Sequence, residues 1–166
     1  NLLDLAITGN LYTGSSKTQI YLNEDGILNV NNLQPQMANV YGGHLSFIDY
    51  NNDGFLDISM SGLATVNFST FTALLLYKWE NGTFVLDDDE NQLSITDGYW
   101  GGQYNHDWAD YDNDGDLDLV SGGISIFDNT NYLTIFKNMN VIRTTHLYFF
   151  CSSSSSKWKF TTKHCI

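Results

Sequence analysis

Two nine-residue stretches of the chain match almost letter for letter, Asp49-Tyr50-Asn51-Asn52-Asp53-Gly54-Phe55-Leu56-Asp57 and Asp110-Tyr111-Asp112-Asn113-Asp114-Gly115-Asp116-Leu117-Asp118. Each has oxygen-bearing side chains at positions 1, 3, 5 and 9, and a glycine at position 6 that permits a sharp bend. These side chains, with a backbone carbonyl at position 7, can surround one hard cation. The sequence therefore predicts two cation-binding loops.

Both loops have the donor chemistry of a calcium site. Their carboxylates would repel one another unless a cation or protons neutralised them, and oxygen-only ligands in a flexible arrangement favour calcium over zinc, copper or magnesium. The alternative is a solvated Asp/Asn-rich turn without metal. The predicted ligands of the two calcium sites are Asp49, Asn51, Asp53, Phe55 (through its carbonyl) and Asp57, and Asp110, Asp112, Asp114, Asp116 (through its carbonyl) and Asp118.

The two loops differ in their number of carboxylates. Asp112 stands in the second loop where Asn51 stands in the first, which adds one negative ligand. We therefore expect the second loop to bind calcium more tightly. An EF-hand is the rival calcium motif, but it requires a glutamate at position 12, where this chain has Met60 and Ser121.

The loops belong to a longer repeat. The last acid of each loop aligns with Asp4, so that Asp4, Asp57 and Asp118 are each followed by a short apolar run closed by glycine. A second strand-like segment follows in each unit, and its aromatic residue lies 17, 20 or 18 residues after the acid. These aromatic residues are Tyr21, Tyr77 and Phe136.

Turn signals complete each unit. Glu24-Asp25-Gly26 and Glu80-Asn81-Gly82 are hairpin turns between strand-like segments. One unit is thus about four short antiparallel strands, and the near absence of a 3.6-residue period predicts few helices. Four-stranded units at this interval predict an all-β fold, a partial β-propeller with the calcium loops between strands.

The loop pattern Asp-x-Asx-x-Asp-Gly-x-Leu-Asp, the glycine-closed strands after it, and the segment at residues 76–84 resemble FG-GAP or VCBS-type repeats, as in integrin α-subunit propellers and secreted bacterial propellers. The resemblance covers about residues 1–140. It implies a fragment of about two and a half blades, because only Asp4 of a first loop is present. The expected divisions are a partial blade at 1–30, a second repeat at 31–86, a third repeat at 87–140, and an atypical basic, serine-rich tail at 141–166 outside the propeller.

Composition limits the partners. The chain has 166 residues, is 42% hydrophobic and carries a net charge of −12. Residues 1–140 hold all 19 acids and three lysines, a net −16, and residues 141–166 carry +4. The acidic part would repel phosphate backbones, so we expect no nucleic acid partner. No apolar stretch is long enough for a transmembrane helix.

The resemblance implies a non-catalytic, calcium-binding segment of a cell-surface or secreted adhesion or recognition protein, whose ligand is a protein or a carbohydrate. The alternative is a propeller domain attached to a secreted polysaccharide-degrading or phospholipase-like enzyme, with catalysis elsewhere in the parent chain. We expect no catalysis by this segment, because the sequence has no evident Ser-His-Asp, Cys-His or zinc constellation.

Overall fold

The computed structural model describes residues 4–12, 14–31, 37–66, 69–87, 105–124, 131–138, 145–151 and 158–164. Within these ranges the chain is all-β: it forms strands and no helix, and thus no helix that could cross a membrane. The strands are β1 (Leu5–Asn10), β2 (Ser16–Glu24), β3 (Ile27–Val30), β4 (Val40–Tyr41), β5 (Leu45–Ile48), β6 (Asp57–Val66), β7 (Ser69–Glu80), β8 (Thr83–Leu86), β9 (Asn105–Ala109), β10 (Asp118–Ile124), β11 (Asn131–Lys137), β12 (Thr145–Cys151) and β13 (Trp158–His164).

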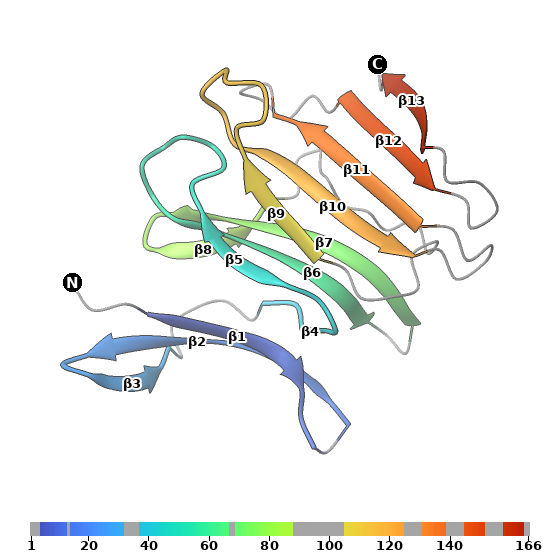
Figure 1. Cartoon of the computed structure of the whole chain (residues 1–166). Coiled ribbons are helices and arrows are strands. Elements are labelled where there is room, and N and C mark those ends of the chain that lie inside the picture. Colours follow the sequence, from blue (N-terminus) through green and yellow to red (C-terminus); the bar gives the residue numbers. More distant parts are fainter. Residues whose placement is uncertain are drawn as a thin grey trace.

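These strands form three antiparallel sheets that follow one another along the chain (Figure 1). The first sheet has the order β1-β2-β3, the second contains β4 to β8, and the third contains β9 to β13. In the second sheet, β4 and β5 both pair with β6, at different places along it, and together they act as one interrupted strand. Otherwise each strand pairs with the next strand in the sequence, so each sheet is a meander.

The three sheets share one register. The residue after the repeated aspartate pairs with the repeated aromatic residue in every sheet. The pairs are Leu5 with Tyr21, Ile58 with Tyr77, and Leu119 with Phe136. The sequence repeat is therefore also a structural repeat.

Two-residue turns close the hairpins after these strands, as predicted. Asp25 and Gly26 join β2 to β3 with φ of 52° and 88°, and Asn81 and Gly82 join β7 to β8 with φ of 52° and 83°. Positive φ at both central residues defines a turn whose twist matches that of the strands. Asp, Asn and Gly are the residues that adopt this conformation most readily.

A close backbone approach interrupts the β4–β5 edge. Gly43 lies so near β6 that a Cβ atom on it would be 1.9 Å from the carbonyl oxygen of Ser61. Only glycine fits at this position without moving the backbone. The paired glycines Gly42-Gly43 thus let the edge strand break and resume as β5.

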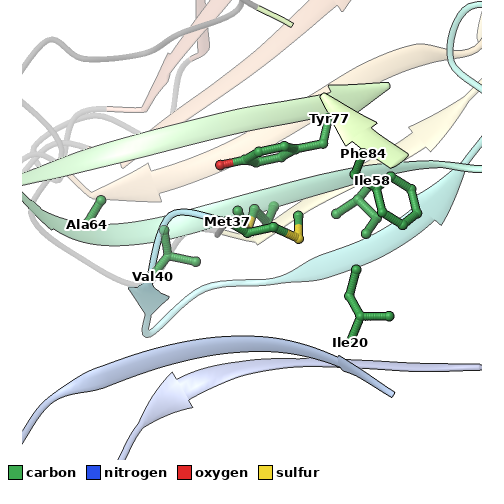
Figure 2. Packing of buried hydrophobic residues seen from close by; sticks show 8 residues of the cluster. Ile20, Met37, Val40, Ile58, Ala64, Tyr77 and Phe84 are labelled. Atoms are coloured by element: carbon green, nitrogen blue, oxygen red, sulfur yellow. The ribbon is translucent and has the colours of Figure 1, made fainter. Parts of the chain in front are cut away.

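The first and second sheets pack face to face around one apolar cluster. Ile20 of the first sheet belongs to one buried cluster with Ile58, Met60 and Tyr77 of the second sheet. Figure 2 shows Ile20, Ile58 and Tyr77 of this cluster. Ile58 and Met60 are fully buried, and each such side chain contributes roughly 1.5–3 kcal/mol of transfer free energy. This contact holds the first sheet against the second.

The second and third sheets pack around another cluster. Leu74 and Leu76 of β7 contact Leu119 and Phe136 of the third sheet, and Trp108 packs against them. An apolar core lies on each face of the second sheet, because its strands alternate between the two clusters. The second sheet is therefore the centre of the molecule.

The basic tail adds strands to the third sheet. β12 pairs with β11 over seven residues, and β13 pairs with β12 over seven. Residues 141–166 lack acids and a glycine-bearing turn, and on this basis the sequence predicts a tail outside the propeller. Their many aromatic and β-branched residues nevertheless suit a strand, and strand formation does not require the acidic loop pattern.

Candidate metal centre

The two acidic loops occupy equivalent places in neighbouring sheets. The first joins β5 to β6 and the second joins β9 to β10. The strand pairs that flank them have the same register, Ile48 with Asp57 and Ala109 with Asp118. In each loop, therefore, the ninth residue lies opposite the residue just before position 1.

Their backbones have the same conformation. Position 4 has a positive φ in both loops, 58° at Asn52 and 60° at Asn113. Position 6 also has a positive φ, 86° at Gly54 and 95° at Gly115. Asparagine and glycine tolerate this region of φ, so the sequence is matched to the fold of the loop.

The aspartate at position 1 organises each loop by accepting two backbone hydrogen bonds. Asp49 accepts from the N–H groups of Asp53 at 3.1 Å and Gly54 at 3.0 Å. Asp110 accepts from Asp114 and Gly115 at the same two distances. Both loops are thus closed around their first carboxylate.

The aspartate at position 9 is buried and is anchored to the next strand. The repeated aspartate accepts a hydrogen bond from the backbone N–H two residues after the repeated aromatic in all three sheets. The donor–acceptor pairs are Asn23 to Asp4 at 2.9 Å, Trp79 to Asp57 at 2.7 Å and Asn138 to Asp118 at 2.7 Å. The C-terminal ends of the loops are therefore fixed to the C-terminal ends of β7 and β11.

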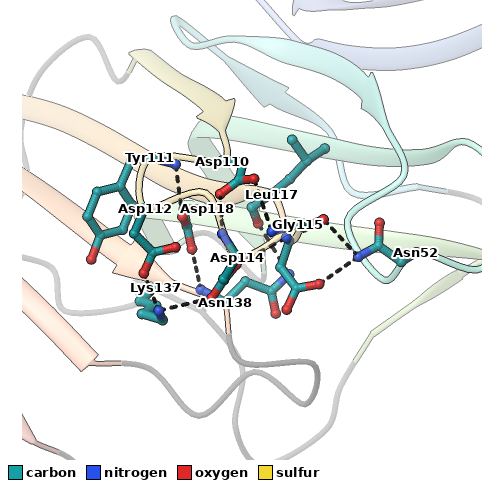
Figure 3. Close-up of polar contacts among 11 residues, drawn as sticks. Asn52, Asp110, Tyr111, Asp112, Asp114, Gly115, Leu117, Asp118, Lys137 and Asn138 are labelled. Carbon is teal, nitrogen blue, oxygen red and sulfur yellow. Dashed lines mark hydrogen bonds and ion pairs between the residues drawn. The ribbon is translucent and has the colours of Figure 1, made fainter.

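In the second loop, three predicted ligands converge. One carboxylate oxygen from each of Asp110, Asp112 and Asp118 lies within 4.8 Å of the other two (Figure 3). Asp118 is buried and Asp112 is exposed, so the three oxygens line a cradle that opens to solvent. Such a group of oxygens suits one hard divalent ion.

Lys137 lies at the edge of this cradle. Its ammonium group forms ion pairs with Asp112 and with Asp114, the latter at 2.9 Å. Hydrogen bonds from Lys137 lower the pKa of Asp114, and the same contacts raise the pKa of Lys137. The ammonium group of Lys137 therefore neutralises two of the predicted calcium ligands.

The first loop has an amide at one of the three equivalent positions. Asn51 stands at position 3, so only Asp49 and Asp57 are acids at the places of Asp110, Asp112 and Asp118. The side-chain amide of Asn51 instead donates to Asp53 at 3.1 Å. Phe55 at position 7 is exposed, whereas the equivalent Asp116 is buried.

Asp57 of the first loop has a buried carboxylate oxygen whose negative charge has no partner beside it in the part of the chain that the structure describes. The residue is fully buried, and its Oδ2 atom has no hydrogen-bond partner within the described ranges. Burial raises the pKa of Asp57 to about 6, and the nearby charges of Asp53 and Asp49 add to the effect. A cation beside Oδ2 would remove the conflict.

The two loops are also linked to each other. The side chain of Asn138 donates to the carbonyl of Tyr50 in the first loop at 2.8 Å and to that of Leu117 in the second at 3.2 Å. Asn52 donates to Asp116 across the same boundary (Figure 3). The two candidate sites are therefore neighbours, and the side chain of Asn138 holds the backbone of both loops.

Sequence reasoning missed a buried polar cluster between the second and third sheets. The two ring nitrogens of His106 contact the hydroxyls of Ser59 at 2.6 Å and Ser61 at 2.8 Å. Trp108 donates its indole N–H to Ser59 at 3.1 Å. The only signal was the alternation of serines in β6, which puts Ser59 and Ser61 on one face.

Comparison with known proteins adds no family assignment. No family model, no curated protein and no solved structure matched the chain.

Proposed function

We propose that the chain is a calcium-binding, non-catalytic segment of FG-GAP/VCBS type, from a cell-surface or secreted protein of adhesion or recognition. The observation that carries the proposal is the convergence of Asp110, Asp112 and Asp118 on one point, in a loop whose backbone is repeated at residues 49–57. The calcium ions hold strand connections together, and the ligand is a protein or carbohydrate bound elsewhere on the segment.

Calcium suits these loops better than other common ions. All their side-chain donors are oxygen, which disfavours zinc and copper. The exposed donors of the second loop leave room for water ligands and a high coordination number, which magnesium does not require. The buried Asp57 oxygen without a hydrogen-bond partner points the same way in the first loop, since a divalent ion would compensate its charge.

The three sheets support the propeller part of the proposal. They share one register and pack face to face in the order of the sequence. Repeating units that bury the faces of their neighbours in this way are the basis of propeller and solenoid folds.

The buried histidine supports a non-catalytic role. His106 contacts Ser59, a pairing that elsewhere could activate a serine nucleophile. Ser59 and Ser61 are buried between two sheets at 0% and 1% exposure, so a substrate carbonyl cannot reach their hydroxyls. The cluster acts as polar packing between the sheets.

Thermal unfolding tests calcium binding. An ion that binds only the folded loops stabilises by RT ln(1 + [L]/Kd), about 2.7 kcal/mol at a hundredfold excess over Kd. We expect millimolar calcium to raise the midpoint relative to chelator, and magnesium to raise it less. Asp112→Asn should reduce the calcium effect, whereas Asp25→Asn in the β2–β3 turn should not. An unchanged midpoint in calcium would contradict the proposal.

A further inference from the structure

The interface between the first and second sheets changes from apolar to polar along its length. On β2, Ile20 belongs to the buried apolar cluster, and Thr18 and Ser16 precede it at intervals of two residues. These residues share one face of the strand because side chains alternate. Their partners on β1 are polar as well, since Thr18 pairs with Thr8 and Ser16 pairs with Asn10. One end of the interface is therefore polar.

The two threonines fix the segment that enters β4. Thr8 donates its hydroxyl to the carbonyl of Val40 at 2.7 Å, and Thr18 donates its hydroxyl to the carbonyl of Ala38 at 2.8 Å. The backbone N–H of Thr18 donates to Oδ1 of Asn39 at 2.9 Å. Because this contact requires an oxygen acceptor, the orientation of the Asn39 amide is set and its nitrogen is left as a donor.

A polar cavity of about 350 Å³ lies at this end of the interface. Its described lining consists of amides, hydroxyls, one phenol ring and a glycine, from Asn10, Gly14, Ser15, Ser16, Asn39 and Tyr41. None of these is an acidic or a basic residue, although the chain carries a net charge of −12. The volume is within the range of sites that hold small molecules, roughly 300–1,000 Å³.

The turn between β1 and β2 forms one wall of the cavity. The backbone N–H of Leu11 donates to the carbonyl of Ser15 at 2.7 Å, and the N–H of Gly14 donates to the carbonyl of Leu11 at 2.9 Å. The wall is thus formed by bonds within the chain, which lowers the entropic cost of binding a ligand. Tyr12 lies in the same turn, between the lining residues Asn10 and Gly14, and is fully exposed.

The cavity lies at the ends of the sheets that point away from the acidic loops (Figure 1). Asn10 is the last residue of β1, whereas the repeated aspartate Asp4 stands just before its start. In the second sheet, Tyr41 pairs with Leu63, which lies far along β6 from Asp57. A ligand in this cavity would therefore not touch the proposed calcium ligands.

The lining favours a neutral ligand with many hydroxyl groups. An ion would find no opposite charge among the described lining residues, and an apolar molecule would leave the amide of Asn39 without a hydrogen bond. The hydroxyls of a pyranose ring both donate and accept, which suits amides and serine hydroxyls. Its C–H faces are apolar and pack on aromatic rings, which Tyr41 supplies in the cavity and Tyr12 in the adjacent turn.

We propose that this cavity binds one neutral pyranose unit of a carbohydrate. The proposal rests on the proposed role of the chain in recognition, and it assigns the ligand of that role to carbohydrate rather than to protein. The amide nitrogens of Asn10 and Asn39 donate to the sugar hydroxyls, and the ring of Tyr12 packs on one face of the sugar. Calcium takes no direct part, because the acidic loops lie at the other end of the sheets.

Saturation-transfer NMR of the 166-residue chain tests the proposal. The probes are the methyl glycosides of glucose, galactose, mannose and N-acetylglucosamine, and we expect transfer from the protein to the ring protons of at least one of them. Tyr12→Ala and Asn39→Asp should each weaken this binding roughly three- to tenfold, as expected for the loss of one contact. Asn39→Asp removes the amide donor but keeps an oxygen for the N–H of Thr18.

Asn29→Ala is the matched control. Asn29 lies on β3, where its side chain donates to Glu24 at 3.0 Å, and it is not among the residues that line the cavity. Sugar binding by this variant should equal that of the parent chain. Circular dichroism of each variant confirms that it is folded, and Tyr12→Ala removes no buried side chain because Tyr12 is fully exposed.

Calorimetry with calcium on the same samples separates this proposal from the proposed calcium sites. A folded chain that binds calcium but shows no transfer to any of these glycosides would overturn the carbohydrate site and leave protein as the ligand of the recognition role. Transfer without calcium binding would support the carbohydrate site and contradict the calcium sites. Sugar binding that is unchanged by both Tyr12→Ala and Asn39→Asp would overturn the assignment of this cavity.

Discussion

The side-chain amide of Asn52 donates a hydrogen bond of 2.7 Å to the carboxylate of Asp116, which joins the two acidic loops across 64 residues of sequence. Asn52 holds position 4 of the first loop, and Asp116 holds position 7 of the second, where a backbone carbonyl is the expected ligand. Asp116 is buried and Asn52 is exposed, so this bond lies partly out of solvent. The position of one loop therefore depends directly on the position of the other.

The Asn52–Asp116 bond should couple calcium binding at the two loops. Asn52→Gly removes the amide while keeping the positive φ, and Asp116→Asn removes the charge. A double-mutant cycle on calcium affinity at the second loop should give a coupling energy of about 0.5–1.5 kcal/mol, the range for a hydrogen bond to a buried partner. Additive effects of the two substitutions would show that the loops bind independently.

Lys137→Met should strengthen calcium binding at the second loop. Lys137 neutralises Asp112 and Asp114, and a calcium ion must displace it to use both carboxylates. We expect roughly a three- to tenfold gain in affinity, because the charge of the ligands tunes these sites. Calorimetry is the measurement.

The matched control for this substitution is Lys78→Met. Lys78 follows Tyr77 as Lys137 follows Phe136, but its ion pair is with Glu80 at 3.7 Å. Its removal should leave the affinity of the first loop nearly unchanged. Equal gains from both substitutions would indicate a general charge effect rather than competition inside the second loop.

Stability should rise with pH between about 4 and 6.5 in saturating calcium. Burial lowers the pKa of His106 to about 4, with His44 adding to the shift. The imidazole of the unfolded chain titrates near 6.5, so between these pH values the unfolded chain binds one more proton than the folded chain. Lowering the pH therefore stabilises the unfolded state and lowers the free energy of unfolding. Urea unfolding should show a gain of about 1–3 kcal/mol that His106→Gln removes.

Chelator should flatten that profile. Without an ion, Asp57 has a pKa of about 6 in the folded chain, against about 3.9 when unfolded. The folded state then binds the extra proton between these values, and stability falls as pH rises, which opposes the effect of His106. An equally steep profile in chelator and in calcium would contradict the assignment of Asp57 as a ligand.

Gly43→Ala should destabilise the second sheet. Its Cβ would meet the carbonyl oxygen of Ser61 at 1.9 Å, so the β4–β5 edge would have to move away from β6. We expect a loss of about 2–4 kcal/mol in urea unfolding, as for other overpacked or strained sites. Gly9→Ala is the control, because no atom lies within 4 Å of the added carbon, and its effect should be near zero.

Local patterns in the sequence predicted the hairpin turns and many of the strands before residue 140. Asp25-Gly26 and Asn81-Gly82 form the expected turns because their conformational preference is intrinsic to those residues. The repeat spacing also predicted that Tyr21, Tyr77 and Phe136 occupy equivalent places. Trp108 packs in the core between the second and third sheets.

Contacts between distant side chains could not be predicted in this way. Lys137 reaches Asp112 across 25 residues, and His106 reaches Ser59 across 47. Such contacts depend on how the sheets pack, which the sequence repeat does not specify. For the same reason, the loop pattern did not reveal that Lys137 pairs with Asp112, one of the three acids that converge in the second loop.

Calorimetric titration of the folded chain with calcium tests whether the two acidic loops bind the ion. We expect two calcium ions per chain with dissociation constants on the order of 0.1–1 mM. Asp53→Ala and Asp114→Ala should each leave one site, and the site at Asp110 to Asp118 should be the tighter in the parent chain. A reversed ranking would contradict the role given to Asp112, and a folded chain that binds no calcium at millimolar concentration would contradict the assignment of both loops as calcium sites.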